Sequence, residues 1–324
     1  MSTQKPGLSV VVCTHNRGDD AVECVQALLH SKEAERLQFI VVDNASDAAN
    51  SERLRHGLND PRVELVSEPT PGLSHARNRG LSLARADWIA YLDDDALPFP
   101  DWAARALELA ESVDANVGLI GGAVLPKWPN HTSDPAVPPT QLGSRWRDLL
   151  SLVEVEQRPP GSNVPHIVGC NLLVRRDLLQ ELGGFSAELG RTPDRLLGGE
   201  EIAIAREIAE RGLKVDFASR LRVYHKISTE RLKTAWIRKR AEAEGELLWK
   251  CSPRAIPKIL LSIPFLAVAS TLRTLPTGSP SDYDHHVRLW HNLGFLKSAV
   301  ASTLLQHRPD FRNRPAAPTR PSPS

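Results

Sequence analysis

The first 125 residues contain short apolar runs of strand length, most of them apolar at nearly every position. These runs occupy residues 8–13, 39–42, 63–66, 88–92 and 117–124. A strand that is apolar throughout is covered on both of its faces. Apolar residues at helical spacing fill residues 21–29 and 73–84, each between two of these runs. This alternation predicts an α/β fold with a mainly parallel central sheet flanked by helices.

In such a sheet the ligand crevice lies at the carboxyl ends of the strands, so the residues that follow each strand are the candidates for chemistry. Residues 126–165 are rich in Pro, Ser, Asn and Asp and predict a long loop over the site, with a short helix near 146–152. The elements expected beyond the loop are a strand at 167–174, a helix at 177–182 and a helix at about 200–211 that stops at Gly212.

The C-terminal part of the chain differs from the rest in charge. Residues 1–230 carry 25 Lys and Arg against 33 Asp and Glu, a net charge of −8, whereas residues 231–300 carry 11 against 5, a net charge of +6. The whole chain is nearly neutral at +1, which gives no sign of a nucleic-acid partner. The pattern is helical from residue 229, and beyond His307 it is rich in Pro, Arg and Ser. We therefore expect an α/β domain at 1–228, a helical region at 229–306 and a disordered tail at 307–324.

Cysteine usage and the N-terminus bear on the compartment. The four cysteines include no C-x-x-C pair, so neither a disulfide framework nor a zinc cluster is indicated. The polar start of the chain leads straight into a strand-like run, with no apolar signal segment between them. These features predict a protein of the reducing cytoplasm.

Three adjacent carboxylates, those of Asp93, Asp94 and Asp95, directly follow the predicted strand at 88–92. Adjacent carboxylates repel one another, and holding them at a strand end usually requires a counter-charge such as a hard divalent cation. A solvated acidic turn is the plainer interpretation. The position of the run at the ligand-binding edge of the sheet favours the metal-binding one.

Two other strand ends also carry polar groups, Thr14, Asn16 and Arg17 after the first strand and Asp43 after the second. Each alone is equally typical of a helix start, because Asp, Asn and Ser are preferred N-caps. The sequence has no P-loop, and residues 13–18 lack the G-x-G-x-x-G pattern of a dinucleotide site. A Rossmann dehydrogenase is therefore disfavoured.

Four charged residues later in the chain have two interpretations each. Arg77 falls at the margin of the apolar face of its helix, where it either reaches a diphosphate or snorkels to the surface. Glu200 and Glu201 follow a glycine pair at a helix start, where they complement the helix dipole or one of them serves as a general base. His225 follows an apolar strand pattern and is either a core-edge histidine or a metal ligand.

In their order and spacing, these residues resemble the family 2 glycosyltransferases of the GT-A fold, bacterial enzymes that transfer a sugar from a nucleotide diphosphate to an acceptor hydroxyl. The matching segments are 11–17, 41–47, 72–80, 91–98, 169–171, 183–185 and 199–201, and the resemblance covers about residues 7–228. It implies a GT-A catalytic domain followed by a helical C-terminal appendage. Residues 236–240 resemble the aromatic and basic helix that follows the catalytic domain in non-processive members. The Q-x-x-R-W signature and the several membrane spans of the processive synthases are not found in the sequence, so the non-processive type is implied.

The resemblance also implies roles for single residues. Contacts to the nucleotide sugar would come from Thr14, Asn16, Arg17, Asp43, Arg77, Asp93 and Asp94. Asp95 and His225 would hold Mg²⁺ or Mn²⁺ against the two phosphates. The usual base of the family is an Asp in a Glu-Asp pair, which here is the pair Glu200 and Glu201. Glu201 occupies the base position with one extra methylene, which leaves the assignment open between the two.

The implied reaction is a single displacement with inversion. An acidic body needs a metal and an arginine at the site to accept a diphosphate, and the cation then stabilises the departing nucleoside diphosphate. The implied donor is a UDP- or dTDP-sugar. The implied acceptor is a hydroxyl of a glycan or of a lipid-linked molecule, as in bacterial polysaccharide or glycoconjugate biosynthesis.

Two other functions compete with this one. A sugar nucleotidyltransferase shares the general architecture, but its first strand should lead into a Gly-rich loop with Arg and Lys, and residues 14–17 do not form one. A non-catalytic glycan-binding or scaffold protein of the same fold has no need of the intact carboxylates and histidine described above.

The basic C-terminal region has two interpretations as well. Its longest predominantly apolar stretch, residues 259–272, has 14 residues broken by Pro264 and is too short to cross a bilayer, which requires about 20. Flanking cations suit an in-plane helix on the cytoplasmic face of the inner membrane, where a lipid-linked acceptor would be met. The alternative is a helix that packs on the catalytic domain or on a second subunit.

Overall fold

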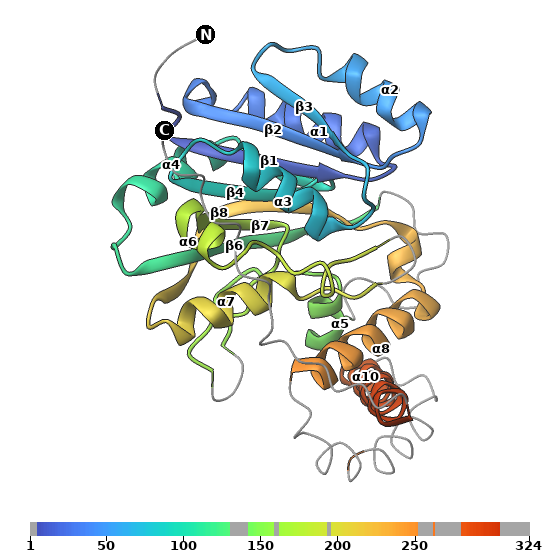
Figure 1. Cartoon of the computed structure of the whole chain (residues 1–324). Helices are drawn as coiled ribbons and strands as arrows, with labels where there is room; N and C mark the ends of the chain where they lie inside the picture. The colour runs from blue at the N-terminus through green and yellow to red at the C-terminus, as the bar shows by residue number, and fades with distance from the viewer. Residues whose placement is uncertain are drawn as a thin grey trace.

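The structure, a computed structural model, describes residues 5–129, 142–158, 162–192, 196–251, 262 and 280–304. Its centre is one eight-stranded sheet with the strand order β3-β2-β1-β4-β7-β6-β8-β5 (Figure 1). The strands are β1 (Leu8–Thr14), β2 (Leu37–Asn44), β3 (Val63–Glu68), β4 (Trp88–Asp93), β5 (Ala96–Pro98), β6 (Val117–Lys127), β7 (Asn171–Arg175) and β8 (Lys214–Lys226). Strands β3, β2, β1 and β4 pair in parallel, as do β6 and β8, whereas β7 and β5 run antiparallel to their neighbours. The predicted mainly parallel sheet is confirmed.

Helices cover both faces of the sheet. One face carries α1 (Gly18–Leu29), α2 (Ala48–Gly57) and α4 (Trp102–Ser112), and the other carries α3 (Leu73–Leu83), α6 (Arg176–Glu181) and α7 (Glu200–Glu210). Strand β1 shows the consequence for sequence: Val10 and Val12 belong to one core, whereas Val11 and Cys13 belong to the other. Because neither face of β1 meets solvent, every position of the strand is buried.

Two elements differ from the sequence prediction. The strand expected at 167–174 begins only at Asn171, because the chain turns at Gly169 and the carbonyl oxygen of Gly169 accepts a hydrogen bond from Arg77 (3.0 Å). Residues 167–170 are nevertheless buried, which explains why they are apolar without belonging to a strand. Strand β5 has three residues at the sheet edge and was not predicted, since so short a run has no periodicity of its own.

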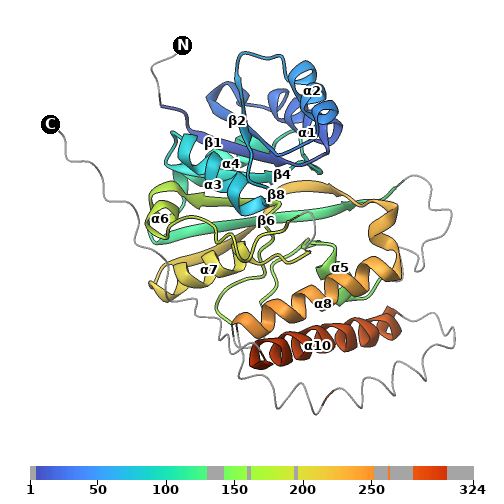
Figure 2. The same cartoon turned by 45° about the vertical axis from the view of Figure 1, so that its right-hand side comes forward.

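The C-terminal helices α8 (Thr234–Cys251) and α10 (Pro280–Leu304) lie side by side below the sheet (Figure 2). Their close approach depends on Gly245 and Gly294, where a Cβ atom would overlap the backbone of the opposite helix. The predicted short helix near 146–152 is α5 (Ser144–Leu149), which packs against both. In the described part of the chain, no helix has the length and apolar character needed to cross a membrane. Apart from Ser262, the segment 259–272 lies outside the described residues, as does the tail beyond residue 307.

Asn171 joins β6, β8 and α4 through buried hydrogen bonds. Its amide nitrogen donates to the carbonyl oxygens of Ala123 (3.1 Å) and Leu221 (2.9 Å), and its amide oxygen accepts from Nε1 of Trp102 (3.0 Å). We expect Asn171→Ala to lower the free energy of unfolding by about 2–4 kcal/mol, because three buried polar groups lose their partner. Chemical denaturation measures the change, with the exposed Asn59→Ala as control at less than about 0.5 kcal/mol. Equal effects of the two substitutions would contradict this role.

Candidate active site

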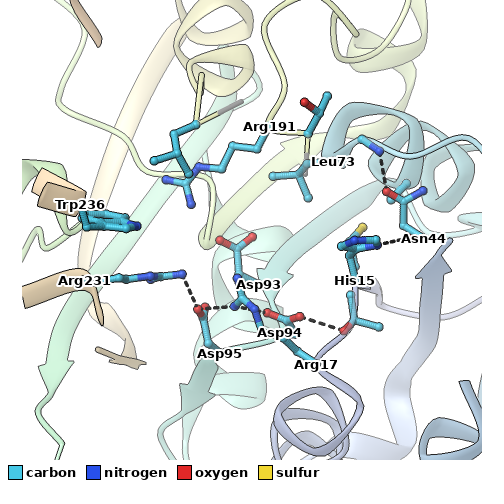
Figure 3. A pocket seen from close by; sticks show the side chains of 16 residues that line it. His15, Arg17, Asn44, Leu73, Asp93, Asp94, Asp95, Arg191, Arg231 and Trp236 are labelled. Atoms are coloured by element: carbon cyan, nitrogen blue, oxygen red, sulfur yellow. Dashed lines mark hydrogen bonds and ion pairs between the residues drawn. The ribbon is translucent and has the colours of Figure 1, made fainter. Parts of the chain in front are cut away.

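A cavity of about 280 Å³ opens at the carboxyl ends of β1, β2 and β4 (Figure 3). Five of the predicted residues line it, namely Thr14, Arg17, Asp93, Asp94 and Asp95. The other predicted residues lie outside its lining and are Asn16, Asp43, Arg77, Glu200, Glu201 and His225. His15 and Asn44, which stand in the polar segments expected after the first two strands, line it too. The rest of the wall includes residues that were not predicted as site residues, among them Leu73, Arg191, Leu196, Arg231 and Trp236.

Asp94 and Asp95 are buried and paired with Arg17, so the interpretation as a solvated acidic turn is wrong for these two members of the aspartate run. Asp94 and Asp95 are 5% and 4% exposed. Nη1 of Arg17 lies 2.9 Å from Oδ1 of Asp94 and 2.6 Å from Oδ2 of Asp95. Thr14 donates its hydroxyl hydrogen to Oδ2 of Asp94 (2.8 Å). Burial raises the pKa of Asp94 to about 7 against the opposing effect of Arg17, and the charge of Asp95 adds to the rise.

His225 is brought to the aspartates by the pairing of β5 with β8, which sets Ala96 opposite His225. Its Nδ1 lies 3.0 Å from the carbonyl oxygen of Leu150, which can only accept, so Nδ1 carries the hydrogen. Its Nε2 lies 2.7 Å from Nη1 of Arg231, which can only donate, so Nε2 presents a lone pair. One nitrogen of the imidazole is therefore fixed by a backbone carbonyl, and the other faces the guanidinium of Arg231. Metal-ligating histidines usually have one ring nitrogen fixed in this way.

Nε2 of His225 and Oδ1 of Asp95 fit a divalent cation. The two acceptor atoms are 3.3 Å apart, a spacing typical of neighbouring ligands bound to one cation at about 2.0–2.4 Å. No three His, Cys, Asp or Glu side chains converge on a metal position within the described residues. A site with two protein ligands suits Mg²⁺, which commonly takes its remaining ligands from substrate phosphates and water.

Arg77 is buried behind the cavity, with 2% of its side chain exposed. Its Nη1 lies 2.6 Å from Oε1 of Glu200, and its Nη2 lies 3.1 Å from Oδ1 of Asp93 and 3.0 Å from the carbonyl oxygen of Gly169. The interpretation as a snorkelling surface arginine is therefore wrong. Contact between Arg77 and a diphosphate stays a prediction, because the guanidinium is shared among protein groups.

The two glutamates at the start of α7 have different surroundings. Glu200 is buried, pairs with Arg77 and accepts the backbone N–H of Gly199 (3.0 Å). Gly199 itself has a φ of +148°, a backbone conformation that favours glycine. Glu201 is partly buried and forms no ion pair within the described residues. Burial raises the pKa of Glu201 to about 7, and the charge of Glu200 adds to the rise.

Asn16 and Asp43 shape the rim between the loops that follow β1 and β2. Asn16 has a φ of +55°, and its side-chain oxygen accepts the backbone N–H of Asp47 (2.8 Å). The carboxylate of Asp43 accepts the backbone N–H of Ser46 (3.3 Å) and the hydroxyl hydrogen of Ser51. Both residues therefore order the loops, and their contacts with a nucleotide stay predictions.

Comparison with known proteins decides the family. The sequence pattern of Glycosyl transferase family 2 matches residues 9–183, which is more than half of the chain. The chain belongs to the family 2 glycosyltransferases. The resemblance found in the sequence is therefore confirmed.

Individual relatives of this glycosyltransferase match most of its length. It is 28% identical over 236 residues to the glucosyl-dolichyl phosphate glucuronosyltransferase of Haloferax volcanii. The aligned region covers 71% of this chain and 72% of the relative. It is 29% identical over 252 residues to the succinoglycan biosynthesis protein ExoM of Rhizobium meliloti. Here the aligned region covers 74% of this chain and 73% of the relative. A mannosyltransferase from Pyrobaculum calidifontis, solved with GDP-Man and Mn²⁺, has the same fold with a TM-score of 0.59 at 18% identity, over 91% of this chain and 88% of that one. The GT-A fold is confirmed.

Three cavity residues of the glycosyltransferase were not found from the sequence: Arg191, Arg231 and Trp236. Arg191 lies in a loop, Arg231 in the short 3₁₀ helix η3 (Thr229–Leu232) and Trp236 near the start of α8. Arg191 and Trp236 do not directly follow a strand, and Arg231 lies five residues beyond the end of β8, so the rule that points to strand ends does not reach them. Two signals were available: the short distance in sequence between Arg231 and His225, and the resemblance of residues 236–240 to the aromatic and basic helix of non-processive members.

Proposed function

We propose that this glycosyltransferase transfers a sugar from a nucleotide-diphosphate donor, a UDP- or dTDP-sugar, to a hydroxyl of a glycan or lipid-linked acceptor, with inversion. The observation that carries the proposal is the cavity at the strand ends, where arginines face buried aspartates. Arg17, Arg191 and Arg231 reach this cavity from three different segments. A guanidinium group can donate two parallel hydrogen bonds to the oxygens of one phosphate, so a cavity lined by three arginines suits a diphosphate.

Asp95 and His225 would hold Mg²⁺ or Mn²⁺ in this proposal. The bound cation would offset the charge of the diphosphate and help the nucleoside diphosphate to leave. The lone pair on Nε2 of His225 and the adjacent Oδ1 of Asp95 support this assignment. The presence of Mn²⁺ and GDP-Man in the related mannosyltransferase structure supports it further.

Glu201 is the proposed general base. A carboxylate with a pKa of about 7 is partly ionised at neutral pH and still basic enough to take a proton from a hydroxyl. As the proton passes to Glu201, the acceptor oxygen forms a bond to the anomeric carbon and the bond from that carbon to the diphosphate breaks. Attack occurs on the face opposite the leaving group, which inverts the anomeric centre without a covalent intermediate. Glu200 is less suited to this task because Arg77 and Gly199 already occupy its oxygens.

The acceptor class is suggested by the relatives. One is named a glucosyl-dolichyl phosphate glucuronosyltransferase and another a succinoglycan biosynthesis protein. Both names support a role for this chain in building a polysaccharide or glycoconjugate, with a saccharide on a lipid carrier as the acceptor.

Release of nucleoside diphosphate from a panel of UDP-, dTDP- and GDP-sugars tests this function. We expect slow hydrolysis of a preferred donor that requires Mn²⁺ or Mg²⁺ and stops in EDTA. Asp95→Asn should lower the rate by about 10²–10³-fold, as loss of a charge-stabilising group does elsewhere, while the exposed Asp216→Asn on the same sheet should leave it unchanged. Full activity in EDTA would contradict the metal assignment. Glycan binding without turnover of any donor would instead support the non-catalytic alternative.

A further inference from the structure

Arg231 uses the same nitrogen of His225 that a divalent cation would need. Nη1 of Arg231 lies 2.7 Å from Nε2 of His225, and Nη2 of Arg231 lies 3.0 Å from Oδ2 of Asp95. The other nitrogen of the imidazole is committed to the carbonyl oxygen of Leu150. Nε2 has a single lone pair, which cannot accept from a guanidinium and bind a cation at the same time. Binding of a cation to His225 therefore requires Arg231 to leave.

We propose that Arg231 exchanges partners during donor binding, an inference that rests on the proposed function. Arg231 leaves His225 and Asp95 when the divalent cation arrives and then binds the diphosphate. The side chain of Arg231 is placed for such an exchange, because it lines the cavity (Figure 3). It is 13% exposed. Its backbone belongs to η3, a four-residue turn between β8 and α8. Rotation of the Arg231 side chain within the cavity would bring the guanidinium from His225 and Asp95 to a bound diphosphate.

The guanidinium of Arg231 has Asp95 as its anionic partner. The side chain of Arg231 is largely buried, and a buried guanidinium needs an anion beside it to offset the loss of water. A cation that takes up the charge of Asp95 deprives the guanidinium of this partner. The diphosphate is the anion that would arrive with the cation, and a fork of N–H donors suits its oxygens.

In this exchange Arg231 lowers the affinity for the cation alone and raises the affinity for the diphosphate that arrives with the cation. A cation that arrives alone must displace Arg231, so its affinity is reduced by the competition. A diphosphate that arrives with the cation gains a contact from the displaced side chain. Arg231→Gln should therefore bind Mn²⁺ alone more tightly and the Mn²⁺ complex of a nucleoside diphosphate more weakly. A residue with a purely structural role would weaken both.

Isothermal titration calorimetry at about pH 8, where imidazole is neutral, measures both affinities without any turnover. The probes are Mn²⁺ alone and preformed Mn²⁺ complexes of UDP, dTDP and GDP. For Arg231→Gln we expect affinity for Mn²⁺ alone to rise about tenfold and affinity for the best nucleotide complex to fall about tenfold. The increase in melting temperature produced by Mn²⁺ alone should also be larger for the variant than for the wild type.

Arg191→Gln is the matched control, because it removes the same charge from the same cavity without an ion pair to Asp95 or His225 in the described residues. It should weaken the nucleotide complex but change affinity for Mn²⁺ alone by less than about twofold. If Arg231→Gln does not fold, Arg231→Lys is the second variant. It keeps the positive charge but loses the paired N–H donors of the guanidinium, so it should raise the affinity for Mn²⁺ by less than the tenfold expected for Arg231→Gln. Equal affinity for Mn²⁺ in the wild type and the folded Arg231 variant would overturn the exchange and leave the proposed function intact. Failure of the wild type to bind any of the nucleotide complexes would overturn the proposed function itself.

Discussion

Glu201→Gln is expected to lower kcat for sugar transfer by about 10³-fold, the scale of a lost general base. The substitution keeps the size and most of the polarity of the side chain but removes its ability to take a proton. Donor binding should persist, because Glu201 does not line the cavity of the arginines and aspartates. Steady-state kinetics measures the loss of kcat, and calorimetry measures donor binding separately. Glu210→Gln, an exposed change on the same helix, is the control and should retain wild-type rates.

The pH profile identifies which glutamate is the base. Because the pKa of Glu201 is raised to about 7, kcat/KM should fall as the pH drops below about 7 and the carboxylate takes up a proton. Glu200 raises this pKa from the same helix, whereas Arg77 and Arg191 lower it from α3 and the neighbouring loop. Glu200→Gln removes the repulsive charge, so the acid limb of its profile should move to lower pH while turnover remains. Loss of turnover in Glu200→Gln with a normal rate in Glu201→Gln would transfer the role of base to Glu200.

Arg77→Met is expected to lower the free energy of unfolding by about 3–5 kcal/mol, the cost of leaving a buried charge without its partner. The substitution leaves the carboxylate of Glu200, which is 3% exposed, and the carbonyl oxygen of Gly169 without their donor. Denaturant unfolding monitored by circular dichroism measures the change. Glu200→Gln in the same chain should restore part of the loss, because the amide carries no charge and retains hydrogen-bonding capacity.

Arg79→Met, two residues further along the same helix, is the control for Arg77. Arg79 is exposed, so its replacement should cost less than about 0.5 kcal/mol. Unchanged stability of Arg77→Met together with lost affinity for a nucleoside diphosphate would contradict the buried role. That outcome would favour the diphosphate contact that the sequence resemblance implies for Arg77.

Much of the candidate site could be found from the sequence, because the crevice of a parallel sheet lies where its strands end. Thr14 is the last residue of β1 and Asp93 is the last residue of β4, and these strands are neighbours in the sheet, so both residues lie at one edge. His225 was found as a strand-associated histidine, but its neighbour Asp95 is set by the pairing of β5 with β8, and β5 had no signal in the sequence. Arg231 and Arg191 were not found because they reach the cavity from a turn and a loop.

The sequence by itself determined the layers of this protein and the edge of the sheet at which its chemistry lies. Local periodicity suffices for both, since a strand buried on two faces must be apolar at every position and its polar residues must follow its end. Only the tertiary structure decided which charges are paired. Arg77 meets Glu200 across 123 residues of chain, and Arg231 meets Asp95 across 136. Coulomb attraction depends on the distance between two charges in space, and desolvation depends on their burial. The separation of two residues along the chain determines neither that distance nor that burial.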